Sequence, residues 1–293
     1  MRTLVFHMLH CIFYRLNKSV LGALLFIAIV MACGNHSMAF AEDVLKIGGV
    51  GSALPSMQLV AEAFEKSHPG VKVQIVPSLG SAAGIKAVLN GALDVGLSGK
   101  PIKDDERGKG AIGTVYAKTP FILVTHKKTA ESGLSTKELV EIYEGKRQTW
   151  TDGTRIRLVL RPESDVDTTI IKRISPEMEQ AVKAALSRKG MIIAITNQDN
   201  DDVVENTPGS LGTSTLAQVI PEKHSLKILS FNGVQPNVKA LAEGTYPLVK
   251  YFYIVTTSRE SALAKQFISF VYSPTGSKIL SENGMVPIDR ARH

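Results

Sequence analysis

The sequence predicts an α/β protein in which mostly parallel sheets are flanked by helices. Strand-like and helix-like segments alternate along the chain from Val44 onward, which is the pattern of parallel sheets joined by helical crossovers. The chain has 293 residues, of which 44% are hydrophobic and 21% charged, so it is long enough to bury a substantial core. Two β-rich segments flank a long block in which strand-like and helix-like segments also alternate. We therefore expect one large domain divided into two lobes.

The first segments after Val44 follow strand and helix periodicities in turn. Apolar residues recur at helical spacing between Leu54 and Phe64, and His68-Pro69-Gly70 ends that helix. We expect strands at 44–50, 71–76 and 94–98, and helices over 54–64 and around 85–89. The charge run Lys103 to Lys109 is expected to be a surface loop.

Two segments are expected to cross between the lobes, Thr119 to Thr125 and Pro247 to Thr256. The boundaries that follow are residues 42–125 plus 247–293 for lobe 1 and residues 126–246 for lobe 2. Other elements are expected as follows: a helix over 136–143, a strand over 156–160, helices within 166–189, a Gly-rich loop over 206–213 and a helix over 264–271.

The N-terminus predicts export from the cytoplasm. Basic residues precede an apolar run, Val20 to Cys33, that is shorter than the about 20 residues needed to span a bilayer. Ala39-Phe40-Ala41 has the small-x-small pattern of a signal peptidase site, so residues 1–41 are expected to be a signal peptide cleaved after Ala41. The alternative is a lipoprotein acylated at Cys33, because Val30 to Cys33 resembles a lipobox. Either interpretation predicts a periplasmic protein, free or lipid-anchored.

Composition and motifs exclude several classes of function. Lys plus Arg number 34 and Asp plus Glu 27, but Arg2, Arg15 and Lys18 lie in the leader, which leaves 31 against 27, or +4. This weak surplus and the 6% aromatic content argue against nucleic-acid binding. Both cysteines lie in the leader, and no zinc-binding motif, nucleophile elbow or P-loop is present. We expect no metal, no cofactor, no catalytic residues and a monomer.

Three strand-to-helix turns in the first lobe share small residues, hydroxyl groups and backbone N–H groups near a helix start. Such turns hold anions, and in parallel α/β sheets they gather at one edge of the sheet. The alternative for each turn alone is an ordinary N-cap. The candidate ligand-binding residues are Gly51, Ser52, Ala53, Ser78, Gly80, Ser81, Ser98 and Gly99.

The second lobe offers Arg161, just past a strand, and Ser164, near the start of the next helix. Arginine supplies a planar fork of donors that suits an oxyanion or a carboxylate. The alternative is a surface arginine paired with Glu163 or Asp165.

With these turns in view, the chain resembles the phosphate-binding-like branch of the type II periplasmic binding proteins, the solute-binding proteins of ABC importers. The opening Gly51-Ser52 turn, the segment Ser78 to Ile85 and the segment Asp94 to Ser98 are similar to that family's anion loops. Ser273 to Lys278, followed by Gly284 to Pro287, is similar to its closing helix and turn. The resemblance implies two lobes that close over an oxyanion, with Ser52, Ser78, Ser81 and Ser98 on one side and Arg161 with Ser164 on the other.

The sequence departs from that family in two places. Phosphate-binding members typically carry an Asp after the third-turn serine, where it accepts the proton of hydrogen phosphate, whereas this chain has Gly99. The second-lobe sequence Pro162 to Asp165 also differs from the family's Gly-Ser-Gly-Thr, and Glu163 or Asp165 is a candidate replacement for the missing acceptor.

The resemblance implies an exported protein that presents a small tetrahedral oxyanion, phosphate first, to an ABC permease in the inner membrane. The alternatives within the binding class are sulfate, molybdate, tungstate or a small carboxylate. Outside it they are a sensor or an enzyme derived from the same fold.

Overall fold

The computed structural model describes residues 43–290. The expected signal peptide, its cleavage after Ala41 and the alternative acylated Cys33 lie outside these residues. Within 43–290, no helix combines the length and the hydropathy needed to cross a bilayer.

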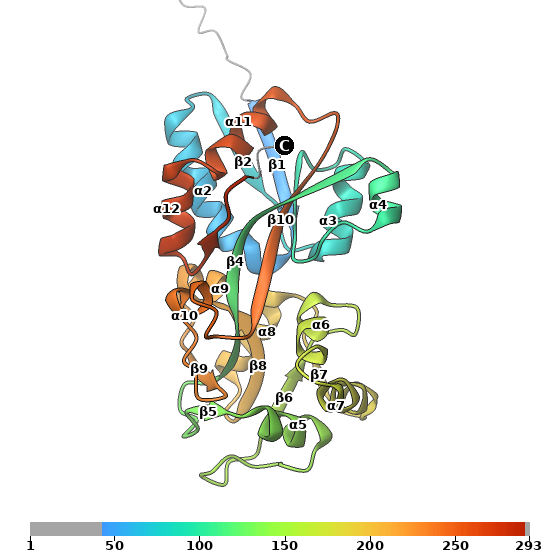
Figure 1. The fold of residues 1–293 in the computed structure, drawn as a ribbon, viewed down its shortest axis with the longest axis vertical. Coiled ribbons are helices and arrows are strands. Elements are labelled where there is room, and N and C mark those ends of the chain that lie inside the picture. Colours follow the sequence, from blue (N-terminus) through green and yellow to red (C-terminus); the bar gives the residue numbers. More distant parts are fainter. Residues whose placement is uncertain (1–42, 291–293) are drawn as a thin grey trace, which may run out of the picture. The chain divides into compact units, whose positions relative to one another are not determined.

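The strands form one continuous hydrogen-bonded sheet whose main path runs β2-β1-β3-β10-β4-β8-β6-β7. We call the part from β2 to the upper end of β4 the first half and the part from the lower end of β4 to β7 the second half (Figure 1). Parallel pairing joins β1 to β2 and β3, β6 to β7 and β8, and β5 to β9. Every antiparallel pair includes β4 or β10. The predicted α/β class with parallel strands in both parts is confirmed.

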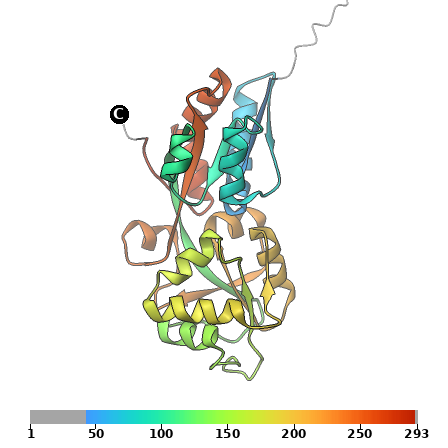
Figure 2. The same cartoon turned by 90° about the vertical axis from the view of Figure 1, so that its right-hand side faces the viewer.

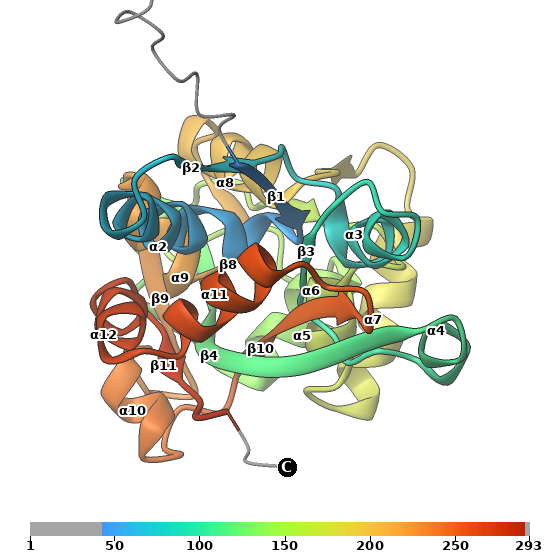
Figure 3. The same ribbon diagram turned by 90° about the horizontal axis from the view of Figure 1, so that it is seen from above.

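The first half places helices on both faces of its sheet (Figures 1 and 3). One face packs on α2, α11 and α12 around Phe64, Phe252 and Phe267, and the other on α3 around Ile85 and Val88. The elements are β1 (Asp43–Gly49), the 3-10 helix η1 (Gly51–Ala53), α2 (Leu54–Ser67), β2 (Val71–Ile75), α3 (Gly80–Leu89), β3 (Val95–Ser98), α4 (Asp104–Gly108), β10 (Val249–Thr257), α11 (Ala262–Val271), α12 (Pro274–Glu282) and β11 (Val286–Pro287).

The second half repeats this layering (Figure 2). Leu139, Trp150 and Met178 belong to the core on one face of the strands, and Val204 and Val219 to the core on the other. The elements are β5 (Gly133–Leu134), α5 (Thr136–Glu144), β6 (Arg157–Leu160), α6 (Val166–Lys172), α7 (Pro176–Ser187), β7 (Ile192–Ile193), α8 (Asn197–Asn206), β8 (Ser210–Thr215), α9 (Leu216–Glu222), β9 (Leu226–Phe231) and α10 (Val238–Ala242).

The strand β4 (Ala111–His126) belongs to both halves. Residues 111–120 pair with β10, whereas residues 121–126 pair with β8 and β9. Ten of its residues are apolar or aromatic, and most of 116–125 is buried, because this stretch is covered on both faces. The partner change at Pro120–Phe121 marks the border between the two halves.

Two predicted loops are regular structure instead. The charge run 103–109 contains the short helix α4, in which the Lys103 backbone N–H donates to Glu106 Oε2 at 2.9 Å. Acidic residues fill its first turn and Arg107 its last, which complements the helix dipole. The run does lie at the surface, as expected.

The prediction of a loop over 206–213 is wrong from residue 210 onward, because Ser210–Thr215 is the fully buried strand β8. Its small residues allow α8 to pack directly on the strand. A Cβ added at Gly212 would lie only 2.6 Å from Val204 Cγ2.

A close approach of backbones fixes the end of β1 and the turn that follows it. Gly49 has φ of 143°, and a Cβ there would lie 2.0 Å from the Leu97 carbonyl oxygen of β3. On α3, a Cβ at Gly84 would lie 2.7 Å from the Gly49 Cα. Only glycine fits at both positions, so β1, β3 and α3 meet with no side chains between them. This packing sets the position of the Gly51–Ala53 turn.

Candidate functional site

The three predicted turns of the first half do converge. The backbone N–H of Gly99 donates to Ser81 Oγ at 2.9 Å, which ties the third turn to the start of α3. A Cβ at Gly51 would lie 2.7 Å from Ser78 Oγ, so the first and second turns are also in contact. Ser52, Ser81, Ser98 and Gly99 are buried. The sequence therefore predicted correctly which turns share one edge of the sheet.

The hydroxyl groups in these turns differ in how they are used. Ser98 Oγ donates to the Lys100 carbonyl at 2.7 Å and accepts from the Lys100 N–H at 3.2 Å, so it closes its own turn. Ser52 is fully buried, and its Oγ has no hydrogen-bond partner among the described residues. Ala53 is buried in the core, whereas Gly80 has φ of 76° and faces open space. Ser52 is thus the fully buried hydroxyl of these turns that has no partner among residues 43–290.

Arg161 follows β6 and is buried, with 5% of its surface exposed. One terminal nitrogen donates to the Ala194 carbonyl at 2.5 Å and to the Thr196 carbonyl, and the other donates to Asp165 Oδ2 at 2.9 Å. Its Nε is buried without a partner among residues 43–290. The guanidinium is therefore held rigidly by the second half, with one donor unused.

The polar residues after Arg161 have separate roles. Ser164 is exposed in the turn before α6, and the structure does not bring it to Arg161. Glu163 is also exposed and accepts from Lys172 Nζ at 2.9 Å, so it is paired within the second half. Asp165 caps α6 by accepting from the Asp167 N–H at 2.8 Å. Burial and the nearby charge of Asp167 raise the pKa of Asp165, and Arg161 opposes this effect.

A buried ion pair that sequence reasoning missed lies beside Arg161. Asp167 in α6 is 1% exposed and accepts from Lys250 Nζ of β10, whose own exposure is 1%. Asp167 Oδ2 also accepts from Asn197 Nδ2 at 2.8 Å and lies 4.0 Å from Arg161 Nε. The one available signal was Lys250 itself, a charged residue in the middle of an otherwise apolar strand sequence.

Gly99 lies against this ion pair. A Cβ at Gly99 would lie 3.1 Å from Lys250 Cε, 3.5 Å from Val166 Cγ1 and 3.7 Å from Ser81 Oγ. The position that carries an acidic side chain in the resembling family is therefore next to a buried lysine here. A carboxylate does lie near Gly99, but it belongs to Asp167 of the second half.

Hydrogen bonds cross directly between the two halves at this point. The Ser52 N–H donates to Asn197 Oδ1 at 3.3 Å, and Gln198 Nε2 donates to the Gly51 carbonyl at 3.2 Å. A groove of about 630 Å³ lies beside these contacts and is lined from both halves by residues that include Pro55, Gln58, Ser78, Thr196, Gln198 and Glu222. The first predicted turn thus contacts the start of α8 directly, and the groove lies beside this contact.

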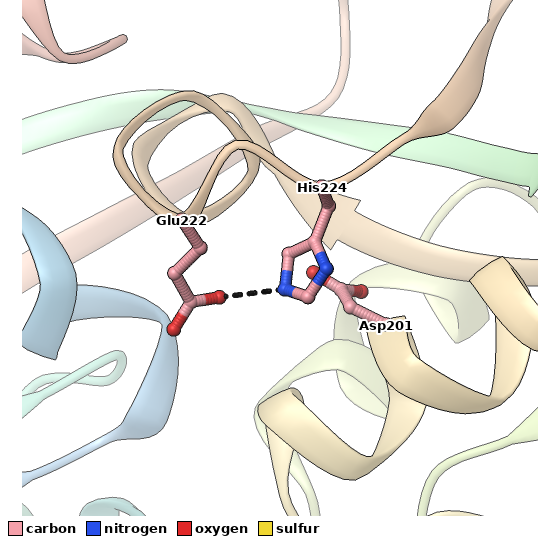
Figure 4. Close-up of side chains that lie close together, drawn as sticks. All are labelled: Asp201, Glu222 and His224. Atoms are coloured by element: carbon pink, nitrogen blue, oxygen red, sulfur yellow. Dashed lines mark hydrogen bonds and ion pairs between the residues drawn. The ribbon is translucent and has the colours of Figure 1, made fainter.

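A second cluster of ionisable groups lies in the second half (Figure 4). Asp201, Glu222 and His224 each place one ligand atom within 4.8 Å of the others. Both ring nitrogens of His224 are already hydrogen-bonded, Nδ1 to Glu205 at 2.8 Å and Nε2 to Glu222 at 3.0 Å. Burial raises the pKa of Asp201 to about 7. Burial lowers the pKa of His224, but Glu205, Asp201 and Glu222 outweigh it and the net shift is upward.

This cluster predicts that stability falls as the pH rises from about 5 to 8. Asp201 and His224 both bind protons more tightly in the folded state, so the free energy of unfolding declines with pH by up to about 1.4 kcal/mol per pH unit for each full proton. The Asp201 contribution declines as the pH rises toward 7, and the His224 contribution declines above 6.5. Urea unfolding across this range should show a shallower decline for Asp201→Asn. Parallel pH profiles of the two proteins would contradict the assignment.

Comparison with known proteins agrees with this architecture. A model of the PBP superfamily domain matches residues 36–275. The chain belongs to the PBP superfamily. Two curated relatives of this superfamily member are named phosphate-binding protein PstS: that of Bacillus subtilis is 27% identical, covering 93% of this chain and 94% of its own, and that of Borreliella burgdorferi is 26% identical, covering 84% and 91%.

Solved structures share the fold of this PBP-superfamily chain. A putative phosphate ABC transporter substrate-binding protein from Clostridium perfringens, solved with bound phosphate, has a TM-score of 0.72 at 22% identity, covering 84% of this chain and all of its own. An ABC-type phosphate transport receptor from Vibrio cholerae has a TM-score of 0.59 at 21% identity, covering 83% and 99%. The predicted two-part binding-protein architecture is therefore shown.

Proposed function

We propose that this chain is the substrate-binding protein of an ABC importer and captures a small tetrahedral oxyanion, phosphate, between its two halves. The relatives named phosphate-binding proteins cover nearly the whole chain, which supports the same ligand class here. The protein acts by binding and presentation and not as an enzyme. Its partner is the importer's membrane permease, and it works as a monomer.

The observation that carries the proposal is a pair of unused, buried donors, one in each half. Ser52 Oγ belongs to the first half and Arg161 Nε to the second, and neither has a partner among the described residues. A buried donor without a partner costs about 1–3 kcal/mol, so such groups call for an explanation. An oxyanion held between the Ser52 turn and Arg161 would satisfy both. The intervening groups are already linked, because Asn197 contacts Ser52 on one side and Asp167 on the other.

The two halves are proposed to be the two lobes, with residues 42–125 plus 247–293 in lobe 1 and residues 126–246 in lobe 2. The partner change of β4 at Pro120–Phe121 and the start of β10 at Val249 support borders close to these. Closure by bending at the two crossing strands is the kind of hinge motion that places a ligand between lobes. Ser78, Ser81, Ser98 and Gly99 would then border the anion from lobe 1.

Export is part of the same proposal. A leader cleaved after Ala41 delivers the protein to the periplasm, where a binding protein meets both its ligand and its permease. Acylation at Cys33 is the alternative fate of the leader. Intact-mass measurement of protein recovered from the periplasm distinguishes a chain that begins at Glu42 from one that retains a lipid on Cys33.

A thermal-shift panel of phosphate, sulfate, molybdate, tungstate and small carboxylates tests the ligand class. An anion present at 100 times its dissociation constant adds about 2.7 kcal/mol of stability, or roughly 5–11 °C in Tm for a protein of this size. We expect phosphate to give the largest shift. A panel in which every oxyanion leaves Tm unchanged would contradict the proposal.

A further inference from the structure

Four charged side chains meet where the two halves touch. Arg161 and Lys250 are positive, Asp165 and Asp167 are negative, and their formal charges cancel. Three of them, Arg161, Asp167 and Lys250, are at most 5% exposed. Burying so many charges is costly unless each is paired, and here every one has an opposite charge within 4.0 Å. A dianion added to this arrangement would leave the site with a net charge of about −2 and no solvent to screen it.

The carboxylate of Asp167 has the surroundings that an oxyanion would need. It accepts hydrogen bonds from Lys250 Nζ and Asn197 Nδ2, and the unused Nε of Arg161 lies 4.0 Å away. Through Asn197 it is connected to the backbone N–H of Ser52. Because Gly99 has no side chain, Lys250 has room on the lobe 1 side to reach the Asp167 carboxylate. Donors from both halves are thus directed at a carboxylate that belongs to the protein.

The remaining space beside this carboxylate is small. On the second-half side, the cavity that Arg161, Asp167 and Thr213 help to line is about 10 Å³, which is about the smallest volume that holds one water. A tetrahedral oxyanion needs several times that volume. Toward the first half, the Ser52–Asn197 and Gln198–Gly51 hydrogen bonds close the contact, so an anion that binds Lys250 and Asn197 must displace Asp167 or open the contact between the halves.

We propose that the Asp167 carboxylate is a resident anion that occupies the oxyanion position, holds the empty halves together through Lys250, and competes with the incoming ligand. This inference rests on the proposed function, because it concerns the same site. It predicts that affinity is set by an exchange: the free oxyanion takes over Lys250 and Asn197 as Asp167 leaves. The side chain that lowers affinity is then Asp167, and Lys250 is part of the binding site.

Calorimetric titration with phosphate tests the competition. Asp167→Asn keeps the shape and the Asn197 contact but removes the competing charge, so we expect its phosphate dissociation constant to fall about tenfold or more below that of the unmodified protein. Asp202→Asn is the matched control, because Asp202 is exposed on α8 and its loss changes the net charge equally. The control should bind phosphate like the unmodified protein. The double variant Asp167→Asn/Lys250→Met leaves no unpaired lysine. It should lose the increase in phosphate affinity that Asp167→Asn alone gives.

A distance measurement without ligand provides a second readout. No cysteine occurs after Cys33, so spin labels on Lys86→Cys in α3 and Gln180→Cys in α7 report only the separation of the two halves. We expect Asp167→Asn to lengthen or broaden this distance in the absence of anion, and phosphate to restore the short distance.

The outcomes separate the two proposals. If the unmodified protein binds phosphate while Asp167→Asn binds it no more tightly and keeps the same label distance, the resident-anion inference is overturned and the proposed function stands. If neither protein binds any oxyanion, the proposed function fails, and the competition fails with it.

Discussion

Replacing Arg161 by alanine is expected to lower the free energy of unfolding by about 3–5 kcal/mol, the usual cost of removing one partner from a buried ion pair. Arg161 donates to Asp165 and to the carbonyls of Ala194 and Thr196, so its loss leaves one buried and two partly buried acceptors without that donor. The remaining carboxylates, Asp165 and Asp167, then face only Lys250. Urea unfolding of Arg161→Ala, followed by phosphate titration of whatever remains folded, measures both effects.

Two variants serve as references for Arg161. Arg161→Lys keeps the charge but cannot reproduce the fork that reaches two carbonyls and a carboxylate, so it should recover little of the loss. Arg157 lies on β6, the strand just before Arg161, and is exposed. Arg157→Ala gives up one contact with the Pro208 carbonyl, so it should cost less than about 1 kcal/mol. Where Arg161→Ala still folds, phosphate affinity should fall roughly tenfold to 150-fold. Equal stabilities of Arg161→Ala and Arg157→Ala would refute the role given to the guanidinium.

Replacing Gly49 by alanine is expected to destabilise the protein by at least about 3 kcal/mol, because two separate penalties coincide. The backbone has φ of 143°, which side-chain-bearing residues rarely adopt, and the new Cβ would lie 2.0 Å from the Leu97 carbonyl oxygen. Neither backbone can move away, since α3 presses on Gly49 from the other side through Gly84. The shifted turn would also displace Ser52 from Asn197, so anion binding should weaken along with stability.

Gly91→Ala separates the two penalties. Gly91 also has a positive φ, 72°, but a Cβ there meets nothing within 4 Å. Its substitution should therefore cost only about 1 kcal/mol, the conformational penalty alone. If thermal or urea unfolding finds the two alanine variants equally stable, the backbone contact between β1 and β3 does not fix the turn as described.

Local patterns were sufficient to predict most of the first half. Strand alternation in β1 and β2, the helical spacing of α2 and the Gly/Ser-rich turns all express short-range preferences, and the structure places these elements where the patterns predicted. The strand β8 was missed because its sequence, Ser-Leu-Gly-Thr-Ser-Thr, is typical of a loop. It becomes a strand only because β4 and β6 provide hydrogen bonds on both sides. Both partner strands are distant from β8 in the sequence, so the local pattern of β8 does not reveal them.

The candidate site shows the same limit. The turns with Ser52, Ser81 and Gly99 were predictable because each follows a strand of one parallel sheet. The partners that decide the chemistry are distant, since Lys250 is 83 residues from Asp167 and Asn197 is 145 residues from Ser52. Glu163 and Asp165 were the acidic candidates because they follow Arg161 directly, yet the buried acid beside Gly99 is Asp167, two residues further along in α6. Sequence proximity to Arg161 did not indicate which acidic side chain turns inward.

A crystal structure of the protein grown in phosphate would show whether the free anion replaces the Asp167 carboxylate. We expect one phosphate between the Ser52 turn and Arg161, in contact with Lys250 and Asn197, with the Asp167 carboxylate turned away from Lys250. A structure in saturating phosphate that keeps the Asp167–Lys250 pair, with no anion between the two halves, would contradict this expectation.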